Sequence, residues 1–289
     1  LLESRGLGDV YKRQNLIELG GGNGEMMKIL IESFQNFPSF QKSCNLIIHE
    51  KSPTLIRIQK KKLSKSKIIW ISKINKLKKN PSIFVANEFF DAMPIKQFQK
   101  YKNIWYEKFV KFENFTKASF VEKKTDIKKI EKKLNFKISQ NQDFIEYSES
   151  GLDYLKNISN FIKKNTGGLL LIDYGDLDKK MKNTLQAVSN HKFANILDNI
   201  GEVDITHNIN FELFKKFTHE QGGLDNYLDT QKNFLIKMGI KQRAELISKD
   251  KNFSKKADIF YRLNRLIDEK QMGTSVSYTH LTLPTINWV

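Results

Sequence analysis

The stretch Asn15–Gly24, NLIELGGGNG, constrains the fold of this 289-residue chain more than any other. Its first half is a short apolar run typical of a buried parallel strand, and its second half is a glycine cluster followed by the amphipathic segment 25–31. This order predicts a strand, a tight turn and a helix. Glycines lack a Cβ and adopt positive φ, so the turn can pass close under a ligand while the helix N-terminus offers free N–H groups. We therefore expect a nucleotide-like ligand at this turn.

The spacing of the glycines narrows the class of ligand. A dinucleotide fingerprint, G-x-G-x-x-G, counted from Gly20 needs a glycine at position 25, where this chain has Glu25. The pattern present is E-x-G-x-G-x-G, with Glu18 in the strand and Gly20, Gly22 and Gly24 after it. It resembles motif I of class I S-adenosylmethionine (SAM) dependent methyltransferases, in which the acid faces the amino-acid end of the cofactor and the glycines admit its methionine and ribose. A purely structural strand–helix turn is the alternative.

Composition indicates a soluble globular protein. With 39% hydrophobic residues the chain can bury a full core, which favours one large domain with insertions over two equal domains. The single cysteine, Cys44, cannot form an intramolecular disulfide and fits a reducing compartment. The longest apolar runs, such as Leu169–Ile172, are far shorter than the roughly 20 residues of a membrane span, so we expect no transmembrane segment. The net charge of +17 is spread over many short lysine runs, which favours solvated surfaces over a nucleic-acid footprint.

Both ends of the chain differ in pattern from the sequence beside them. Residues 1–14, LLESRGLGDVYKRQ, and residues 275–289, SVSYTHLTLPTINWV, resemble translated adaptor or vector sequence of non-native origin. We therefore expect the domain to occupy residues 15–274. Within it, an inserted β and charged segment is expected at 96–146, and substrate-side loops and helices at 176–274. On this interpretation the chain is a fragment, truncated at both ends.

Short apolar strands alternate with helices along the expected domain, which predicts an α/β fold with an open sheet. After the first strand, further strands are expected at 45–50, 67–71, 82–86 and 169–173. Helices are expected at about 24–35, 53–63, 150–164, 212–220 and 230–240. The runs 97–99 and 103–110 alternate apolar and polar residues, which predicts inserted antiparallel strands that cover the ligand crevice. A charged, mobile link is expected at 122–135.

Polar side chains follow two strands at the edge where a ligand binds in an open α/β sheet. Glu50 ends the second strand, where an acid accepts hydrogen bonds from ribose hydroxyls in Rossmann-like folds. Asn87, Glu88 and Asp91 follow the fourth strand, and burying such groups unpaired costs about 1–3 kcal/mol each. They are therefore candidates for a site. A helix cap is the structural alternative for Asn87 and Asp91.

The fifth strand and a later loop bring more polar groups toward this edge. Asp173 and Tyr174 leave the fifth strand there. The loop 201–211 carries Glu202, Asp204 and His207, a spacing compatible with an acid/base set, a metal site or a cap with turn bonds. No companion Cys or His spacing supports a metal, so we expect none.

Several strings of the chain match, in the same order, the MidA-like methyltransferases, the family of the mitochondrial complex I assembly arginine methyltransferase and its bacterial relatives. They are ELGGGNGEMM, VANEFFDAMPIKQF, LLIDYGD, NTLQAV with HKF, GEVDITHNINF and TQKNFLIKMGI. The resemblance covers roughly residues 15–273. It implies a Rossmann-like, seven-stranded SAM-dependent methyltransferase sheet with an antiparallel β insertion and a helical C-terminal part.

In its characterised branch, the resemblance implies methylation of an arginine on a subunit of respiratory complex I (NADH:quinone oxidoreductase) during assembly. This would take place in the cytoplasm of a bacterium or the mitochondrial matrix of a eukaryote. The family also has an N-terminal helical region before motif I and a last strand after a Met–Gly pair. In this chain residues 1–14 stand in place of the helical region. The last strand is expected to be missing after Met272–Gly273.

Arginine chemistry gives the candidate acids a role. A guanidinium is protonated, with a pKa above about 12, so its site needs carboxylates that hold it bidentately and localise its charge away from the attacking nitrogen. Glu88 and Asp91, with Glu202 or Asp204 from the facing loop, are the available acids. His207 is expected to orient that loop rather than accept a proton. The residues expected at the cofactor are Glu18, Gly20, Gly22, Gly24, Glu50 and Asn87.

Two other function classes remain open. A non-catalytic SAM-binding assembly factor would keep the fold and bind a partner through the insertion and the basic surface. A nucleic-acid methyltransferase is suggested by the net charge and by Asn87–Phe90, which is faintly similar to the N-P-P-Y motif of amino-methylases. The missing Pro-Pro-aromatic sequence and the added charge of Glu88 weigh against it, because that motif stacks a flipped base.

Overall fold

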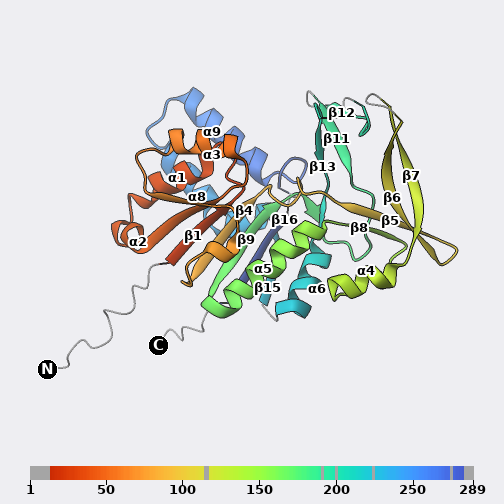
Figure 1. Cartoon of the computed structure of the whole chain (residues 1–289). Helices are drawn as coiled ribbons and strands as arrows, with labels where there is room; N and C mark the ends of the chain where they lie inside the picture. Colours follow the sequence, from red (N-terminus) through yellow and green to blue (C-terminus); the bar gives the residue numbers. More distant parts are fainter. Residues whose placement is uncertain are drawn as a thin grey trace.

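The structure is a computed structural model that describes residues 14–113, 117–189, 192–198, 201–222, 225–273 and 276–282. The strands of its central sheet are β1 (Gln14–Leu19), β2 (Cys44–His49), β3 (Ile68–Ile71), β4 (Ser82–Asn87), β9 (Gly167–Asp173), β15 (Asp225–Thr230) and β16 (Val276–Thr282). They form a seven-stranded sheet in the order β15-β16-β9-β4-β1-β2-β3 (Figure 1). Strands β1, β2, β3, β4 and β9 pair in parallel, whereas β16 is antiparallel to both β9 and β15.

The chain reverses direction across this sheet between β1 and β4. From β1 it moves outward through β2 to β3, and from β4, on the other side of β1, it moves outward to β9. Right-handed crossovers therefore put the connecting helices on opposite faces. They are α1 (Glu25–Phe34) and α3 (Pro53–Lys62) on one face and α5 (Glu149–Asn165) on the other (Figure 1). Ligands of open α/β sheets bind beyond the carboxyl ends of the strands at such a switch point.

Helix α5 packs on the sheet through a stripe of apolar residues spaced three or four apart. Leu152, Leu155, Ile158 and Ile162 are fully buried, and each contributes about 1.5–3 kcal/mol by leaving water. The Ser148 hydroxyl accepts a backbone N–H of the first turn and caps the helix. The buried stripe determines which face of α5 meets the sheet and leaves a polar stripe exposed beside it.

An antiparallel sheet is inserted between β4 and α5, as the alternating runs predict. Its strands are β5 (Lys96–Tyr101), β6 (Ile104–Phe112), β7 (Ala118–Thr125) and β8 (Phe144–Tyr147), in the order β7-β6-β5-β8. The hairpin of β6 and β7 projects away from the central sheet (Figure 1). Phe98 of β5 is fully buried in the same core as Phe84 of β4, so the insertion is packed onto the domain rather than separate from it.

The prediction of a mobile link at 122–135 is wrong. Strand β7 continues to Thr125, and residues 127–134 form helix α4 (Ile127–Leu134), whose N-cap is Asp126. Ile127 and Leu134 are buried, and Ile130 packs against the same core. This helical spacing of apolar residues outweighs the high charge of the segment, because the lysines occupy the opposite, solvated face.

Short elements complete the described part of the fold. Strand β10 (Gly175–Asp176) pairs with β14 (Ile209–Asn210), and β11 (Gln186–Ser189) pairs with β12 (Lys192–Ala194) and β13 (Asp204–Thr206). The remaining helices are α2 (Pro38–Ser43), η1 (Ile74–Lys76), α6 (Phe211–Gly222), α7 (Gln231–Lys237), α8 (Ile240–Ser248) and α9 (Phe253–Ile267). The single helix expected at 230–240 is divided, because Gly239 adopts the left-handed conformation, with φ of +81°, between α7 and α8.

The expectation that residues 275–289 lie outside the fold needs correction. Residues 276–282 form β16, which is hydrogen-bonded between β9 and β15. Backbone pairing does not depend on side-chain identity, and this segment is rich in the β-branched and aromatic residues that favour strands. Residues 1–13 and 283–289 lie outside the described residues, and Gln14 already belongs to β1. Among the described helices, none is long and apolar enough to cross a lipid bilayer.

We predict that Gly167→Ala destabilises the protein more than Gly201→Ala. Both glycines have positive φ, +131° and +94°, so alanine meets backbone strain of about 1–2 kcal/mol at each. A Cβ at Gly167 would lie 1.9 Å from the Ser82 carbonyl oxygen and push β9 off β4, whereas one at Gly201 meets no atom within 4 Å. Urea unfolding should show an extra loss of at least about 2 kcal/mol for Gly167→Ala. Equal stability of the two variants would contradict this close approach of β4 and β9.

Candidate active site

The glycine turn between β1 and α1 is shaped by conformations that glycine adopts without strain. Gly20, Gly22 and Gly24 have φ of +64°, +49° and +82°. A Cβ built on Gly20 would lie 2.6 Å from the ring of Phe89, the second residue after β4, so this residue packs closely on the turn. A Cβ on Gly22 would meet no atom within 4 Å. The turn therefore has open space at Gly22, where a ligand is expected.

Glu18, at the end of β1, is a buried acid with an unsatisfied oxygen. Its side chain is 3% exposed, and its Oε2 atom has no hydrogen-bond partner in the described part of the chain. Burial raises the pKa of Glu18 to about 7, although a hydrogen bond from the Met27 backbone acts in the opposite direction. Such an acid is available to a cationic or hydrogen-donating ligand.

Glu50 is tied to the glycine turn by a residue that the sequence did not single out, Gln59. The Glu50 Oε1 atom accepts the backbone N–H groups of Lys51 and Ser52 at 2.8 and 2.9 Å, and its Oε2 accepts Gln59 Nε2 at 3.3 Å. Gln59 Nε2 also donates to the Gly22 carbonyl at 2.8 Å. Gln59 therefore joins α3, the end of β2 and the turn. Its position between Leu55 and Leu63, on the inward stripe of α3, is the sequence signal that marks it.

Asp173, the last residue of β9, holds the segment after β4. Its Oδ2 accepts the backbone N–H groups of Phe90 at 3.0 Å and Asp91 at 3.4 Å, and its Oδ1 accepts that of Tyr174 at 2.8 Å. Asp173 is 2% exposed, and burial, followed by the charge of Asp91, raises its pKa to about 7 despite these donors. The carboxylate therefore braces the turn that carries the candidate acids.

Glu88 and Asp91 lie on this braced turn and interact electrostatically. Glu88 is exposed and adopts φ of +46°, a strained conformation for a residue with a Cβ, of the kind that gathers at functional sites. Burial, and then the charge of Glu88, raise the pKa of the nearby Tyr174. Asp91 is buried, and burial, then the charge of Glu88, raise its pKa. Asn87 is exposed at the end of β4, and no described helix begins at 87 or 91, so the helix-cap alternative is wrong.

The loop before β14 supplies part of the set expected from it. The His207 backbone N–H donates to the Asp91 carbonyl at 3.3 Å, its Nδ1 lies 3.2 Å from the Asn208 carbonyl oxygen, and its buried Nε2 has no partner among the described residues. The charge of Asp204 contributes to the raised pKa of Asp91, which places it near the acids. Glu202 is exposed, and no hydrogen bond or ion pair within the described ranges joins it to this cluster.

A second buried imidazole, His49, lies at the end of β2. It is 2% exposed, its Nε2 is 3.3 Å from the Tyr154 hydroxyl, and its Nδ1 has no partner in the described structure. The Phe89 and Tyr154 rings contact it edge to face at 6.3 and 5.4 Å. Burial, then the charge of Lys51, lower the pKa of His49, which favours the neutral ring. No local pattern marks this residue, because its partners are remote in the chain.

Buried polar atoms without partners in the described chain thus lie at the ends of β1 and β2 and in the loop before β14. Within the described residues, the buried polar side-chain atoms that lack a hydrogen bond are Glu18 Oε2, His49 Nδ1 and His207 Nε2. Buried polar groups in proteins are nearly always paired, so these three are suited to a bound polar ligand. No three His, Cys, Asp or Glu side chains of the described ranges are grouped as metal ligands would be.

A family model of S-adenosyl-L-methionine-dependent methyltransferases, Methyltransf_28, matches residues 3–228. The chain belongs to this methyltransferase family. It is 26% identical over 301 residues to a Xenopus tropicalis protein named "Protein arginine methyltransferase NDUFAF7, mitochondrial". The matched region covers 91% of this chain and 66% of the relative. The human protein of that name is 24% identical, covering 91% of this chain and 65% of the relative. The chain therefore spans about two thirds of the length of these relatives.

Two crystal structures of Burkholderia thailandensis proteins share the fold of this methyltransferase family member. One superposes with a TM-score of 0.77 at 18% identity, covering 95% of this chain and 75% of that one. The other, solved with S-adenosylhomocysteine bound, gives a TM-score of 0.74 at 18% identity, covering 93% of this chain and 71% of that one. The mixed α/β fold, with a largely parallel main sheet and an antiparallel inserted sheet, is therefore that of SAM methyltransferases.

We predict that Glu18→Gln stabilises the protein in mildly alkaline solution and not in acid. The folded-state pKa of about 7 lies above the ordinary value of 4.5, so the contribution of the protonated acid is full below about pH 4.5 and is lost as the pH rises through 7. Glutamine stays neutral, so the free energy of unfolding of the variant should exceed that of the parent by about 3 kcal/mol near pH 8. Urea unfolding at both pH values measures this. A difference in the free energy of unfolding that does not change with pH would mean that Glu18 ionises normally.

Proposed function

We propose that this chain is a SAM-dependent protein arginine N-methyltransferase that acts on a subunit of respiratory complex I during assembly. The observation that carries the proposal is the convergence of the acids after β4 with the unpaired Glu18 carboxylate at one switch point of the sheet. The acids after β4 suit a guanidinium, and Glu18 suits the amino group of the cofactor. The names of the relatives support the same reaction.

The groups around the glycine turn fit SAM. The open space at Gly22 leaves room for the cofactor, and Glu18 Oε2 is free to accept from its amino group. Glu50 accepts three hydrogen bonds of the roughly four that a carboxylate can accept, which leaves capacity for a ribose hydroxyl. We assign Asn87, which is exposed at the end of β4, to the same ligand. When bound, SAM supplies a methyl group activated by a sulfonium.

The residues after β4 and β9 would hold the acceptor. We assign Glu88, which is exposed and near Tyr174, to the guanidinium, with Asp91 beside it and Asp204 on the facing loop. An arriving cation favours the ionised form of Asp91 and so opposes the effect that raises its pKa. Localising the positive charge on the nitrogens that these acids contact leaves the remaining nitrogen a better nucleophile. His207 keeps the facing loop in place through its bond to the Asp91 carbonyl.

The strand order supports the finer description of the fold. Strands β9, β4, β1, β2 and β3 are parallel, and β16 and then β15 follow beyond β9, with β16 antiparallel to both of its neighbours. This order suits a Rossmann-like, seven-stranded methyltransferase sheet. The relatives are named as mitochondrial proteins. We place the activity in the mitochondrial matrix for a eukaryotic source and in the cytoplasm for a bacterial one.

We predict that Gly22→Val abolishes SAM binding while the protein stays folded. The valine side chain would enter the open space at Gly22 and meet no protein atom at its Cβ. The φ of +49° adds backbone strain of about 1–3 kcal/mol, which is less than the roughly 5–15 kcal/mol that stabilises a typical domain. Calorimetric titration with SAM should give no detectable heat for the variant and a saturable signal for the parent. The thermal unfolding midpoints of both proteins control for folding. A variant that titrates like the parent would show that the cofactor lies elsewhere.

We predict that Glu88→Gln keeps SAM affinity and loses most methyl transfer. A charge-assisted hydrogen bond to a guanidinium contributes about 1.5–3 kcal/mol, so losing it in the transition state lowers the rate by roughly ten- to a hundredfold. The assay follows radiolabelled methyl groups from SAM into complex I subunits of the source organism, with the modified arginine located by mass spectrometry.

Glu202→Gln is the matched control for this experiment. It removes the same charge from an exposed acid of the facing loop that makes no described contact with the cluster, so transfer should continue at the parental rate. Parental transfer by Glu88→Gln, or equal loss in both variants, would contradict the assigned role. SAM binding by the parent without transfer to any protein would instead favour a non-catalytic assembly factor.

A further inference from the structure

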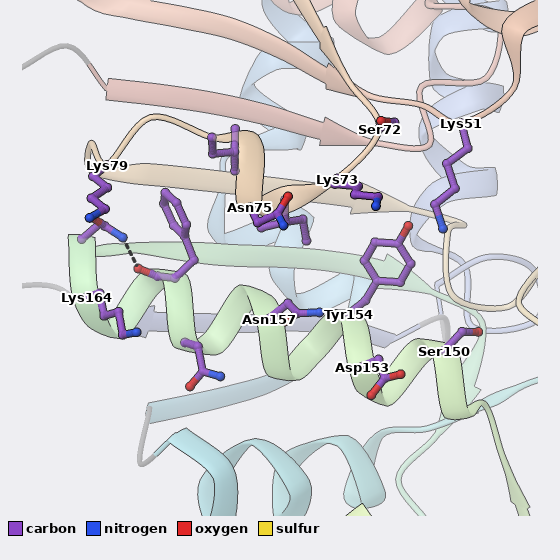
Figure 2. A pocket seen from close by; sticks show the side chains of 15 residues that line it. Lys51, Ser72, Lys73, Asn75, Lys79, Ser150, Asp153, Tyr154, Asn157 and Lys164 are labelled. Carbon is purple, nitrogen blue, oxygen red and sulfur yellow. Dashed lines mark hydrogen bonds between the residues drawn. The ribbon is translucent and has the colours of Figure 1, made fainter.

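A groove of about 590 Å³ runs along helix α5, apart from the acid cluster. Figure 2 shows it between α5 and the segment 72–79, which joins β3 to β4. Lys51 and Ser150 lie at one end of the groove, and Lys79 and Lys164 lie at the other. The groove is a second concave surface that the proposed reaction does not use.

The length of the groove suits an extended chain. Its helical wall runs from Ser150 to Asn165, which is about 22 Å at 1.5 Å per residue. The residues on this wall, including Asp153, Asn157 and Lys164, recur at spacings of three, four and seven, so they form one straight stripe. A stripe of that length matches about six or seven residues of extended peptide at roughly 3.3 Å each.

The charges of the groove favour an anionic occupant. Its lining includes the four lysines Lys51, Lys73, Lys79 and Lys164, against the single acid Asp153. Within the described ranges, none of these lysines forms an ion pair with a carboxylate. A concave surface lined by one sign of charge concentrates ligands of the opposite sign.

The amide side chains of the groove favour a peptide as that anion. Asn75, Asn157 and Asn160 are exposed in the lining, and each offers two N–H donors and a carbonyl acceptor, the groups that pair with a peptide backbone. Asn165 is used differently, because its Nδ2 donates to the Phe161 carbonyl at 2.9 Å.

The aromatic side chains of the groove argue against nucleic acid. Single-stranded nucleic acid binds through aromatic rings on which bases stack. Tyr154 is packed edge to face with His49 and Phe89 and lies under Lys51, whose Nζ is 5.1 Å from the ring centroid. Phe161 packs edge to face with Phe84. Both rings are already in use, so neither is a free platform for a base.

We propose that the α5 groove is a docking site for an extended acidic segment of a protein partner. Its Lys51 end adjoins the candidate cofactor site, because Glu50 precedes this lysine and the Tyr154 hydroxyl is 3.3 Å from His49 Nε2. A segment bound in the groove would leave it beside the crevice. The inference does not rest on methyl transfer, since docking requires only the lysines and amides of the groove.

The test measures binding of a fluorescein-labelled peptide of about seven residues, in which glutamate alternates with serine, to the full chain by fluorescence anisotropy. The parent should bind it, and added salt should weaken the binding, because screening acts on exposed charges. The groove variant reverses three lysine charges and should bind at least about tenfold more weakly. It combines Lys73→Glu, Lys79→Glu and Lys164→Glu.

A matched control separates groove binding from the effect of net charge. The control variant reverses three exposed lysines that are sequence neighbours of the first set and do not line the groove: Lys76→Glu, Lys78→Glu and Lys163→Glu. It should bind the peptide within about twofold of the parent at moderate salt. Equal loss in both variants would overturn the proposal, since it would show attraction to overall charge alone.

Further measurements complete the test. Tighter binding of a thymidine oligonucleotide than of the peptide, lost in the groove variant, would make this a nucleic-acid site and also overturn the proposal.

Thermal unfolding checks that the variants fold. If the triple variant does not fold, the single changes Lys164→Glu and Lys163→Glu provide the same comparison. Calorimetry with SAM should be unchanged in the groove variant, so a failure of docking is distinguishable from a failure of the proposed function.

Discussion

The buried carboxylate of Asp173 is the interaction on which the candidate active site depends. It accepts the backbone N–H groups of Phe90, Asp91 and Tyr174, and the first of these partners lies 83 residues away in the sequence. Hydrogen bonds to a charged acceptor contribute about 1.5–3 kcal/mol each, enough to offset the strain of a left-handed residue such as Glu88. Because β4 and β9 are neighbours in the sheet, this brace joins their two ends at the edge where the acids lie.

The same edge carries groups whose burial is unfavourable for folding. Burial raises the pKa of both Glu18 and Asp173 to about 7, and a buried oxygen of Glu18 and buried ring nitrogens of His49 and His207 lack partners within the described part of the chain. Groups placed for packing alone would be apolar or fully paired. Carboxylates that are already partly desolvated interact strongly with an arriving cation, so the arrangement exchanges stability for binding.

Three consecutive residues at the end of β2 connect the crevice to the α5 groove. Glu50 is hydrogen-bonded toward the glycine turn through Gln59, whereas Lys51 lies over the Tyr154 ring in the groove. His49 contacts the hydroxyl of the same tyrosine. Successive side chains of an extended segment point in opposite directions, so one strand end serves two surfaces. Changes in this segment therefore affect both regions.

The sequence by itself determined the parallel strands, the glycine turn and the antiparallel insertion, because periodicity and glycine spacing are local signals. It also predicted that acids after the fourth strand meet the loop that carries Asp204 and His207. Only the tertiary structure decided that Gln59 links the turn to β2, that Asp173 braces the acids and that residues 276–282 enter the sheet. These outcomes rest on pairings between segments far apart in the chain, and such pairings exist only once the backbone has folded.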